Sequence, residues 1–233
     1  MTEERKRLTI VIPALNEEKA ISKTIAAIPK ADLEQMGYNI QVLIVDNGST
    51  DGTAELAKKA GAEVIFEPKR GYGKALKTGF DSAQGDVIVT ADADATYPLE
   101  DIPSLLAVFQ EDHLDFLTTN RLAGLDDGAM TPVNSTGNRI LSIATRVLFQ
   151  LDMRDPESGM WMFKKDILGA LELHSDSWPL SHEIKIEACY YDRCRWKEVP
   201  IRYRRRVGKT KLLNAWKVGL IDLCHIAKKR LVR

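Results

Sequence analysis

Short runs of β-branched and aliphatic residues recur along the first half of the chain, and between them apolar residues repeat at helical spacing. The apolar runs predict buried strands over residues 8–13, 42–46, 63–66, 87–91 and 114–119. The segments between them predict helices over residues 17–28, 53–60, about 75–83 and about 100–110. This alternation predicts an α/β fold with a mostly parallel sheet and helices on both faces, whose ligands bind at the carboxyl ends of the strands.

The pattern is less regular in the second half. A polar, glycine-containing stretch over residues 122–134 predicts a mobile loop. Further helices are predicted over 135–151 and 181–190, and further strands over 160–163 and 196–203. A last helix is predicted over 212–230, with basic ends and an apolar stripe formed by Leu213, Trp216, Leu220, Leu223 and Ala227.

Composition is that of a soluble globular protein, with 44% apolar and 28% charged residues in a chain of 233. No apolar run approaches the ~18 residues that a transmembrane helix needs, and the charged first residues predict no secretory signal. The three cysteines form no Cys-x-x-Cys pair, which predicts reduced thiols in a cytosolic protein.

The net charge of zero conceals an uneven distribution. Residues 202–233 hold 11 Lys and Arg against one acidic residue, so the other 201 residues hold 22 basic and 32 acidic ones. This basic end predicts contact with an anionic partner. Arg202, Arg204, Arg205 and Arg206 are expected to be too dense for internal acids to pair them all. A nucleic-acid partner is disfavoured, because interleaved aromatics, helix-turn-helix spacing and zinc spacing are all lacking.

Two carboxylates, Asp92 and Asp94, directly follow the predicted strand over residues 87–91. In extended chain, positions i and i+2 point to the same side, so two like charges would face each other there. A divalent cation between them is one solution, and Mg²⁺ or Mn²⁺ would keep positions open for substrate phosphates. The alternative is a polar strand exit that caps the next helix.

Other segments join this pair in an ordered set: Pro13 to Glu17, Val45 to Thr53, and Gly71 to Lys74. Together they resemble glycosyltransferase family 2, with its GT-A fold, over roughly residues 8–212. The branch that the chain resembles is that of the polyprenyl-phosphate sugar synthases, such as dolichol-phosphate mannose synthase. The second half is similar to this branch in three places: the Asp-x-x-Ser-Gly turn at 155–159, the Glu-Val-Pro segment at 198–200, and the Arg-x-x-Gly-x-Ser-Lys-Leu segment at 205–212.

The resemblance implies a glycosyltransferase domain over 1–211, with a nucleotide-sugar half over about 1–120 and an acceptor half over about 121–211. It implies metal contacts from Asp92 and Asp94, with Thr96 as a further one. The residues that it implies for the nucleotide sugar are Pro13, Leu15, Glu17, Asp46, Arg70, Lys74, Asp92, Ala93, Asp94, Arg205 and Lys211. Those that it implies for the reaction and the acceptor are Asp94, Arg121, Arg139, Ser142 and Glu183.

Several of these residues have simpler alternatives. Asp46 can cap the following turn, Glu17 can favour the helix dipole as a solvated carboxylate, and Arg139 can be an ordinary surface residue. Two positions depart from the family pattern: Asn47 stands where a second Asp is frequent, and Thr96 stands where dolichol-phosphate mannose synthases have Gln. The glycines at 71 and 73 predict a close approach of backbone amides to a diphosphate, although their spacing is not that of a P-loop.

The resemblance implies an inverting, Mg²⁺- or Mn²⁺-dependent transfer of a hexose from a donor of the GDP-mannose or UDP-glucose type to a polyprenyl phosphate. A non-lipid glycan acceptor is the alternative, and a nucleotidyltransferase or a non-catalytic membrane-surface or nucleic-acid binder would be further ones. The enzyme is expected in the cytoplasm, peripheral to the membrane, with residues 212–233 lying in the interface as a basic amphipathic helix. The donor base, the sugar and the oligomeric state are left open.

Overall fold

The computed structural model describes residues 6–208 and 215–232. Its strands are β1 (Lys6–Ala14), β2 (Tyr38–Asp46), β3 (Glu63–Phe66), β4 (Val87–Thr90), β5 (Phe116–Asn120), β6 (Trp161–Lys164) and β7 (Trp196–Pro200). Its α-helices are α1 (Ile21–Ala26), α2 (Lys30–Gln35), α3 (Thr53–Lys59), α4 (Tyr72–Ser82), α5 (Ile102–Glu111), α6 (Pro132–Phe149), α7 (Leu180–Ile186) and α8 (Ala215–Val232). Short 3₁₀ segments cover Leu99–Asp101, Arg121–Ala123 and Lys165–Ala170, and a π-helical turn over Glu187–Tyr191 continues α7.

The strands form one sheet in the order β3-β2-β1-β4-β6-β5-β7. Every strand runs in the same direction except β6, which is antiparallel to both of its neighbours, β4 and β5. The predicted mostly parallel sheet is therefore confirmed, with one reversed strand that was not predicted. Because β6 is reversed, the residues that precede it arrive at the edge where the parallel strands end.

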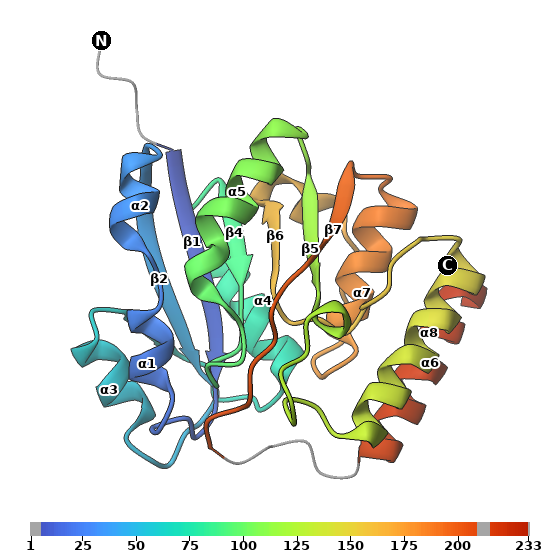
Figure 1. The fold of residues 1–233 in the computed structure, drawn as a ribbon, viewed down its shortest axis with the longest axis horizontal. Helices are drawn as coiled ribbons and strands as arrows, with labels where there is room; N and C mark the ends of the chain where they lie inside the picture. Colours follow the sequence, from blue (N-terminus) through green and yellow to red (C-terminus); the bar gives the residue numbers. More distant parts are fainter. Residues whose placement is uncertain (1–5, 209–214, 233) are drawn as a thin grey trace.

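Helices cover both faces of the sheet, as predicted (Figure 1). One core cluster joins α1, α2, α3 and α5 to the face that carries Leu8, Ile10 and Ile12 of β1. The other joins α4, α6, α7 and α8 to the face that carries Val11. Side chains alternate between the two faces along a strand. Since both faces are covered, the strands must be apolar throughout, and this explains the continuous runs in the sequence.

The predicted elements are confirmed in kind, but some of their ends differ. Strand β2 begins at Tyr38, earlier than predicted, because it pairs with β1 along its whole length. Helix α1 begins only at Ile21, and the short helix α2 was not predicted. Helix α6 begins at Pro132, where the side chain of Thr131 caps it by accepting a hydrogen bond from the N–H of Asn134. The predicted loop over 122–134 is correspondingly shorter.

Candidate active site

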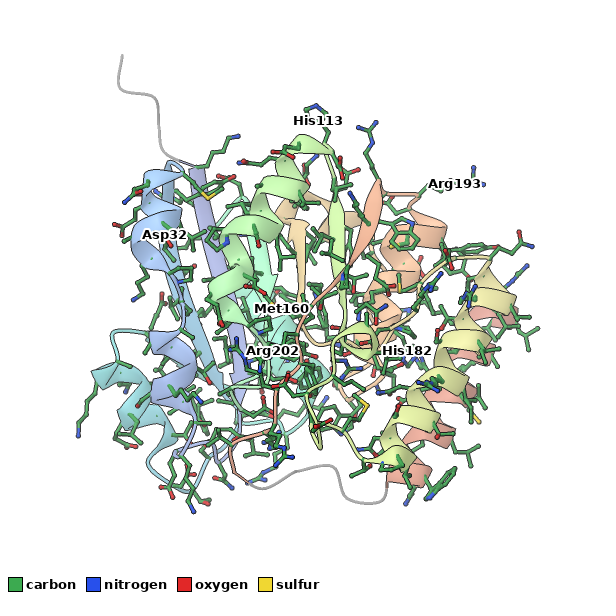
Figure 2. The ribbon with its side chains drawn as sticks, in the orientation of Figure 1. Asp32, His113, Met160, His182, Arg193 and Arg202 are labelled. Carbon is green, nitrogen blue, oxygen red and sulfur yellow. The ribbon has the colours of Figure 1, made fainter. Side chains whose placement is uncertain are left out.

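The carboxyl edge of the sheet gathers segments that are distant in sequence. Strand β4 leads into Asp92 and Asp94, β5 leads into Arg121, and the reversed β6 brings residues 155–159 beside them. Among the residues labelled in Figure 2, Met160, His182 and Arg202 lie toward this edge, whereas His113 and Arg193 lie at the opposite end of the strands. Charged side chains from these segments therefore lie together at the carboxyl edge of the sheet, where the sequence predicts the site.

Asp94 is buried and held from two sides. Its Oδ1 accepts hydrogen bonds from the N–H of Thr96 at 3.1 Å and from the Thr96 hydroxyl at 2.6 Å. Its Oδ2 accepts a hydrogen bond from Nη1 of Arg206 at 2.5 Å. Thr96, for which a metal contact was expected, therefore fixes the orientation of Asp94, and its direct contact with a metal stays a prediction.

Asp92 is half-buried beside Asp94. The Tyr72 hydroxyl donates to its Oδ1 at 3.1 Å. Removal from water, together with the nearby charge of Asp94, raises the pKa of Asp92 to about 7. A cation that binds Asp92 below that pH must displace a proton, so binding becomes more favourable as the pH rises through about 7.

The residues present fit a divalent metal. Carboxylate oxygens are the ligands that Mg²⁺ and Mn²⁺ prefer, and Mg²⁺ commonly takes one or two carboxylates and completes its coordination with phosphates and water. Space is kept beside Asp92 by Gly159, where a Cβ atom would lie 3.0 Å from Oδ1. Within the described ranges, 6–208 and 215–232, no three His, Cys, Asp or Glu side chains gather as a closed metal cage would require. Asp92 and Asp94 thus form an open pair rather than a complete coordination shell.

Arg121 is locked to the edge of the sheet by Asp155. Its Nε and Nη2 donate to the two carboxylate oxygens at 2.7 Å each, and its backbone N–H donates to the same carboxylate at 2.9 Å. Asp155 is fully buried, at 0% exposure. Nη1 of Arg121 makes no hydrogen bond with any residue that the structure describes, and the guanidinium lies over the ring of Tyr203, 5.5 Å from its centre.

The turn over residues 155–159 is fixed by a buried lysine that the sequence analysis missed. Nζ of Lys185 donates to the carbonyl oxygens of Pro156 and Ser158 at 2.6 Å each. It lies 4.6 Å from the ring centre of Trp161. Burial lowers the pKa of Lys185 to about 8. No local pattern distinguishes this lysine from a surface lysine, because only the packing of α7 places it inside.

Internal acids pair three of the four arginines of residues 202–206, which were expected to be too dense for all of them to be paired. Loops that follow β1, β4 and β5 bring carboxylates from three parts of the chain to this segment. The pairs are Arg202 with Asp126, Arg204 with Glu100, and Arg206 with both Asp94 and Glu17. Arg205 donates instead to the carbonyl oxygen of Asp127, and Arg206 is the arginine of this segment that contacts Asp94. Contact of Arg205 with the nucleotide sugar stays a prediction.

The glycines at 71 and 73 lie against another part of the chain, and their approach to a diphosphate stays a prediction. A Cβ on Gly71 would lie 2.1 Å from the carbonyl oxygen of Asp176, and one on Gly73 would lie 2.7 Å from that of Ser175. The N–H of Gly71 donates to Oδ1 of Asn47 at 2.8 Å. These glycines allow residues 175–177 to pack against the start of α4.

The other residues expected for the nucleotide lie near the ends of β1, β2 and β4 and at the start of α4, in contacts within the protein. Asp46 forms the turn cap that was its alternative role, accepting from the N–H of Ser49. Pro13 and Leu15 are half-buried at the end of β1. Further contacts are Arg70 with the carbonyl oxygen of Gly48, Lys74 with Glu67, and the carbonyl oxygen of Ala93 with the hydroxyl of Thr24. Lys211 lies outside the described residues.

Two of the residues expected for the acceptor lie apart from the carboxylate pair. Arg139 is exposed on α6. Ser142, one turn later, is buried and donates to the carbonyl oxygen of Met153 at 3.3 Å. One side chain is thus exposed and the other is buried. Direct contact of Arg139 and Ser142 with an acceptor stays a prediction.

Glu183, for which a role toward the acceptor was expected, is bound within the domain, and that role stays a prediction. Its carboxylate is 1% exposed and accepts from the N–H groups of His174 and Ser175. It also pairs with Lys229 of α8 at 3.2 Å. Burial alone would raise the pKa of Glu183, but these two N–H donors and the charge of Lys229 bring it below its ordinary value. Glu183 therefore fastens α8 to the domain.

Two histidines, His182 and His225, connect helix α8 to the turn beside Asp92. Nδ1 of His182 lies 2.8 Å from Oε1 of Glu157, in the turn beside Asp92, and its Nε2 lies 2.9 Å from Nδ1 of His225 in α8. Burial, with the neighbouring His182, lowers the pKa of His225 to about 4. His182 thus links the turn over residues 155–159 to α8.

Tyr72 is a residue of the site that sequence reasoning missed. Besides its hydrogen bond to Asp92, its ring stacks on Trp178 with centroids 4.8 Å apart. The only sequence signal for Tyr72 is its place between the two glycines of the 71–74 segment. The role expected of that segment rests on its backbone amides and not on its side chains. Tyr72 and Trp178 thus form an aromatic wall beside the carboxylates.

Known proteins share both the sequence and the fold. The model of glycosyl transferase family 2 matches residues 9–171. The low-salt glycan biosynthesis hexosyltransferase Agl6 of Haloferax volcanii is 35% identical over 207 residues, which are 88% of this chain and 49% of that protein. The dolichyl-phosphate hexose transferase of the same organism is 31% identical over 209 residues, covering 88% of this chain and 86% of that one. The chain thus spans about half the length of Agl6 and most of the length of the second relative.

Among solved structures, glucosyl-3-phosphoglycerate synthase of Mycobacterium tuberculosis, in complex with Mn²⁺, UDP and glucosyl-3-phosphoglycerate, is similar with a TM-score of 0.76 and 22% identity. The similarity covers 97% of this chain and 80% of that one. At this level of identity it concerns the fold, and it confirms the predicted GT-A fold. The family match covers more than half of the chain, and we conclude that this chain belongs to glycosyl transferase family 2.

Proposed function

We propose that this enzyme transfers a hexose from a nucleotide-diphosphate sugar, of the GDP-mannose or UDP-glucose type, to a polyprenyl phosphate with inversion at the anomeric carbon. The observation that carries the proposal is the open pair of Asp92 and Asp94, with arginines on both sides of it. The relative named a dolichyl-phosphate hexose transferase supports the lipid acceptor. The solved neighbour that holds glucosyl-3-phosphoglycerate supports the alternative, a non-lipid acceptor.

The chemistry of the proposed reaction follows from charge. A Mg²⁺ or Mn²⁺ ion on Asp92 and Asp94 would neutralise the charge of the departing diphosphate. A phosphate acceptor is largely ionised at neutral pH, since its second pKa is about 6, so it needs positioning more than a general base. Arg121 has Nη1 left for that task, and Asp155 holds its guanidinium still. In this proposal the donor half is about residues 1–120 and the acceptor half about 121–211.

Helix α8 buries two of its charged residues, Asp222 and Lys229, beside the apolar Ile226, and leaves several large apolar residues exposed. Asp222, Ile226 and Lys229 are buried against the domain, whereas Trp216 is 68% exposed and Leu220 is 63% exposed. Lys229, which belongs to the basic end expected at the membrane interface, pairs with Glu183 and Glu187. None of the described helices combines the length and the apolar character that crossing a bilayer demands.

Exposed apolar side chains are concentrated on α6 and α8, which lie side by side (Figure 1). These two helices carry nine of the twelve large apolar side chains that are exposed in the described part of the chain. The nine are Val133, Ile140, Ile143, Val147, Trp216, Leu220, Ile221, Leu231 and Val232. Lys217 and Lys228 are exposed on the same helix as Trp216. We propose that this apolar surface rests in the interface of an anionic membrane, at the cytoplasmic side, where the polyprenyl tail remains.

Replacing Trp216 and Leu220 with glutamine should weaken binding to anionic liposomes by about tenfold or more, since burying one large apolar side chain contributes about 1.5–3 kcal/mol. Sedimentation with phosphatidylglycerol vesicles at low salt measures the change. Phe66→Gln is the matched control, because Phe66 is 63% exposed on β3, at the other edge of the sheet. Equal sedimentation of the Trp216/Leu220 variant and the parent would contradict the membrane role of this surface.

The function itself is tested by the release of nucleoside diphosphate. The protein is incubated with Mn²⁺ and a panel of GDP- and UDP-sugars, with and without a polyprenyl phosphate in detergent. Release that requires the lipid phosphate supports the proposal, whereas release with a soluble glycan or phosphoglycerate alone supports the alternative acceptor. A product that retains the donor's anomeric configuration would refute inversion.

A further inference from the structure

Arg206 makes two ion pairs at the carboxylate pair. Its Nη1 contacts Oδ2 of Asp94 at 2.5 Å, and its Nη2 contacts Oε1 of Glu17. Both acids are nearly buried. The backbone supports the arrangement, because the N–H of Val207 donates to the carbonyl oxygen of Asp94 at 3.0 Å. The guanidinium is thus held against the carboxylate for which we predict metal binding.

The two oxygens of Asp94 are not equivalent. Oδ1 receives both donors of Thr96, whereas Oδ2 receives only the guanidinium of Arg206 among the hydrogen bonds of the described residues. A divalent cation that binds Asp94 therefore meets Arg206 at Oδ2. Two positive groups at one oxygen repel each other, and an arginine does not relieve this by losing its proton. The guanidinium must move as the cation arrives.

We propose that Arg206 is a built-in counter-cation that competes with the divalent metal for Asp94 and then pairs with the diphosphate of the donor. The planar guanidinium matches phosphate oxygens in a bidentate manner, and the donor would bring such oxygens to the metal. This inference rests on the proposed nucleotide-diphosphate donor. It makes Arg206 a residue that couples the binding of metal and nucleotide.

The coupling has a measurable consequence. Without nucleotide, Arg206 opposes the metal, so Mn²⁺ alone binds weakly. With nucleoside diphosphate present, Arg206 has a new partner, so each ligand strengthens the binding of the other by the same factor. Loss of the arginine side chain should have opposite effects on the two ligands: metal alone binds more tightly, and nucleotide in the presence of metal binds more weakly.

The test is a Mn²⁺ titration followed by the electron paramagnetic resonance signal of the free ion, with and without GDP or UDP. It is run at pH 8, where Asp92, with a pKa of about 7, is ionised. Arg206→Ala should bind Mn²⁺ alone about tenfold more tightly than the parent, within the usual range of coupling between two sites. In saturating Mn²⁺ it should bind the nucleoside diphosphate about tenfold more weakly.

Arg202→Ala is the matched control, because this arginine belongs to the same segment but pairs with Asp126. It should leave both affinities unchanged. Arg206→Gln provides a second variant that keeps hydrogen-bond donors and removes the charge, in case the alanine variant does not fold. Unchanged or weaker binding of Mn²⁺ alone by a folded Arg206 variant would overturn the competition. Since no acceptor is present, failure of lipid-dependent transfer would refute the proposed function and leave this result standing.

Discussion

Asp94→Asn should lower kcat/KM by about 10³-fold or more, because a bound metal contributes several kcal/mol of charge stabilisation and about 1.4 kcal/mol corresponds to tenfold in rate. The amide keeps the shape of the carboxylate, so it still accepts the hydrogen bonds from Thr96. It lacks the charge that attracts the cation. The measurements are donor turnover at saturating Mg²⁺ and the affinity for Mn²⁺.

The fold should survive this change, because Arg206 keeps its second partner, Glu17. Thermal unfolding of the variant verifies this. Asp166→Asn is the matched control, since Asp166 is an exposed carboxylate in the 3₁₀ segment after β6. Normal turnover by Asp94→Asn with Mg²⁺ would show that the paired-carboxylate site is wrong.

The second large effect should come from Arg121→Ala, which we expect to lower the free energy of unfolding by about 3–5 kcal/mol, the usual cost of leaving a buried charge without its partner. The cost is large because Asp155 is fully buried and both of its oxygens accept from the guanidinium. Arg121→Lys should recover only part of the loss, since an ammonium lacks the forked geometry. Urea unfolding measures the change.

A double variant separates the structural role of Arg121 from its catalytic role. Arg121→Met with Asp155→Leu removes both charges of the pair and should regain part of the lost stability. It should still fail to transfer sugar, because Nη1 is gone. Arg202→Ala, which removes an exposed arginine, should leave the midpoint of unfolding unchanged. If Arg121→Ala unfolds at the same urea concentration as the parent, the ion pair does not stabilise the edge of the sheet.

The sequence by itself determined the elements of the fold and the position of the site. Strands buried on both faces need continuous apolar runs, and this local requirement marks β1, β2, β3 and β4 in the pattern. Parallel strands end at one edge, so the carboxylates after β4 had to lie there. The family resemblance rests on the same segments, because they carry side chains at strand ends, where local sequence and site coincide.

Only the tertiary structure decides which of two adjacent arginines in residues 202–206 reaches the carboxylate pair. In an extended chain, a shift of one residue turns a side chain to the opposite side. Arg205 and Arg206 differ by that single step, and the contacts with Asp94 and Glu17 select Arg206. No pattern within residues 202–206 specifies this, because the selecting acids come from the loops after β1 and β4.

Packing against the domain determines which side of helix α8 faces inward. Helical periodicity shows an apolar stripe but does not say which side of the helix meets the domain. Here the domain offers His182, Glu183 and Glu187, all buried on or just after α7, and Lys229 pairs with both of these acids. A buried charge needs a partner more than an exposed apolar side chain needs cover, so Lys229 turns inward to these acids and Trp216 is left outside. That preference depends on groups far apart in the sequence, and only the folded structure brings them together.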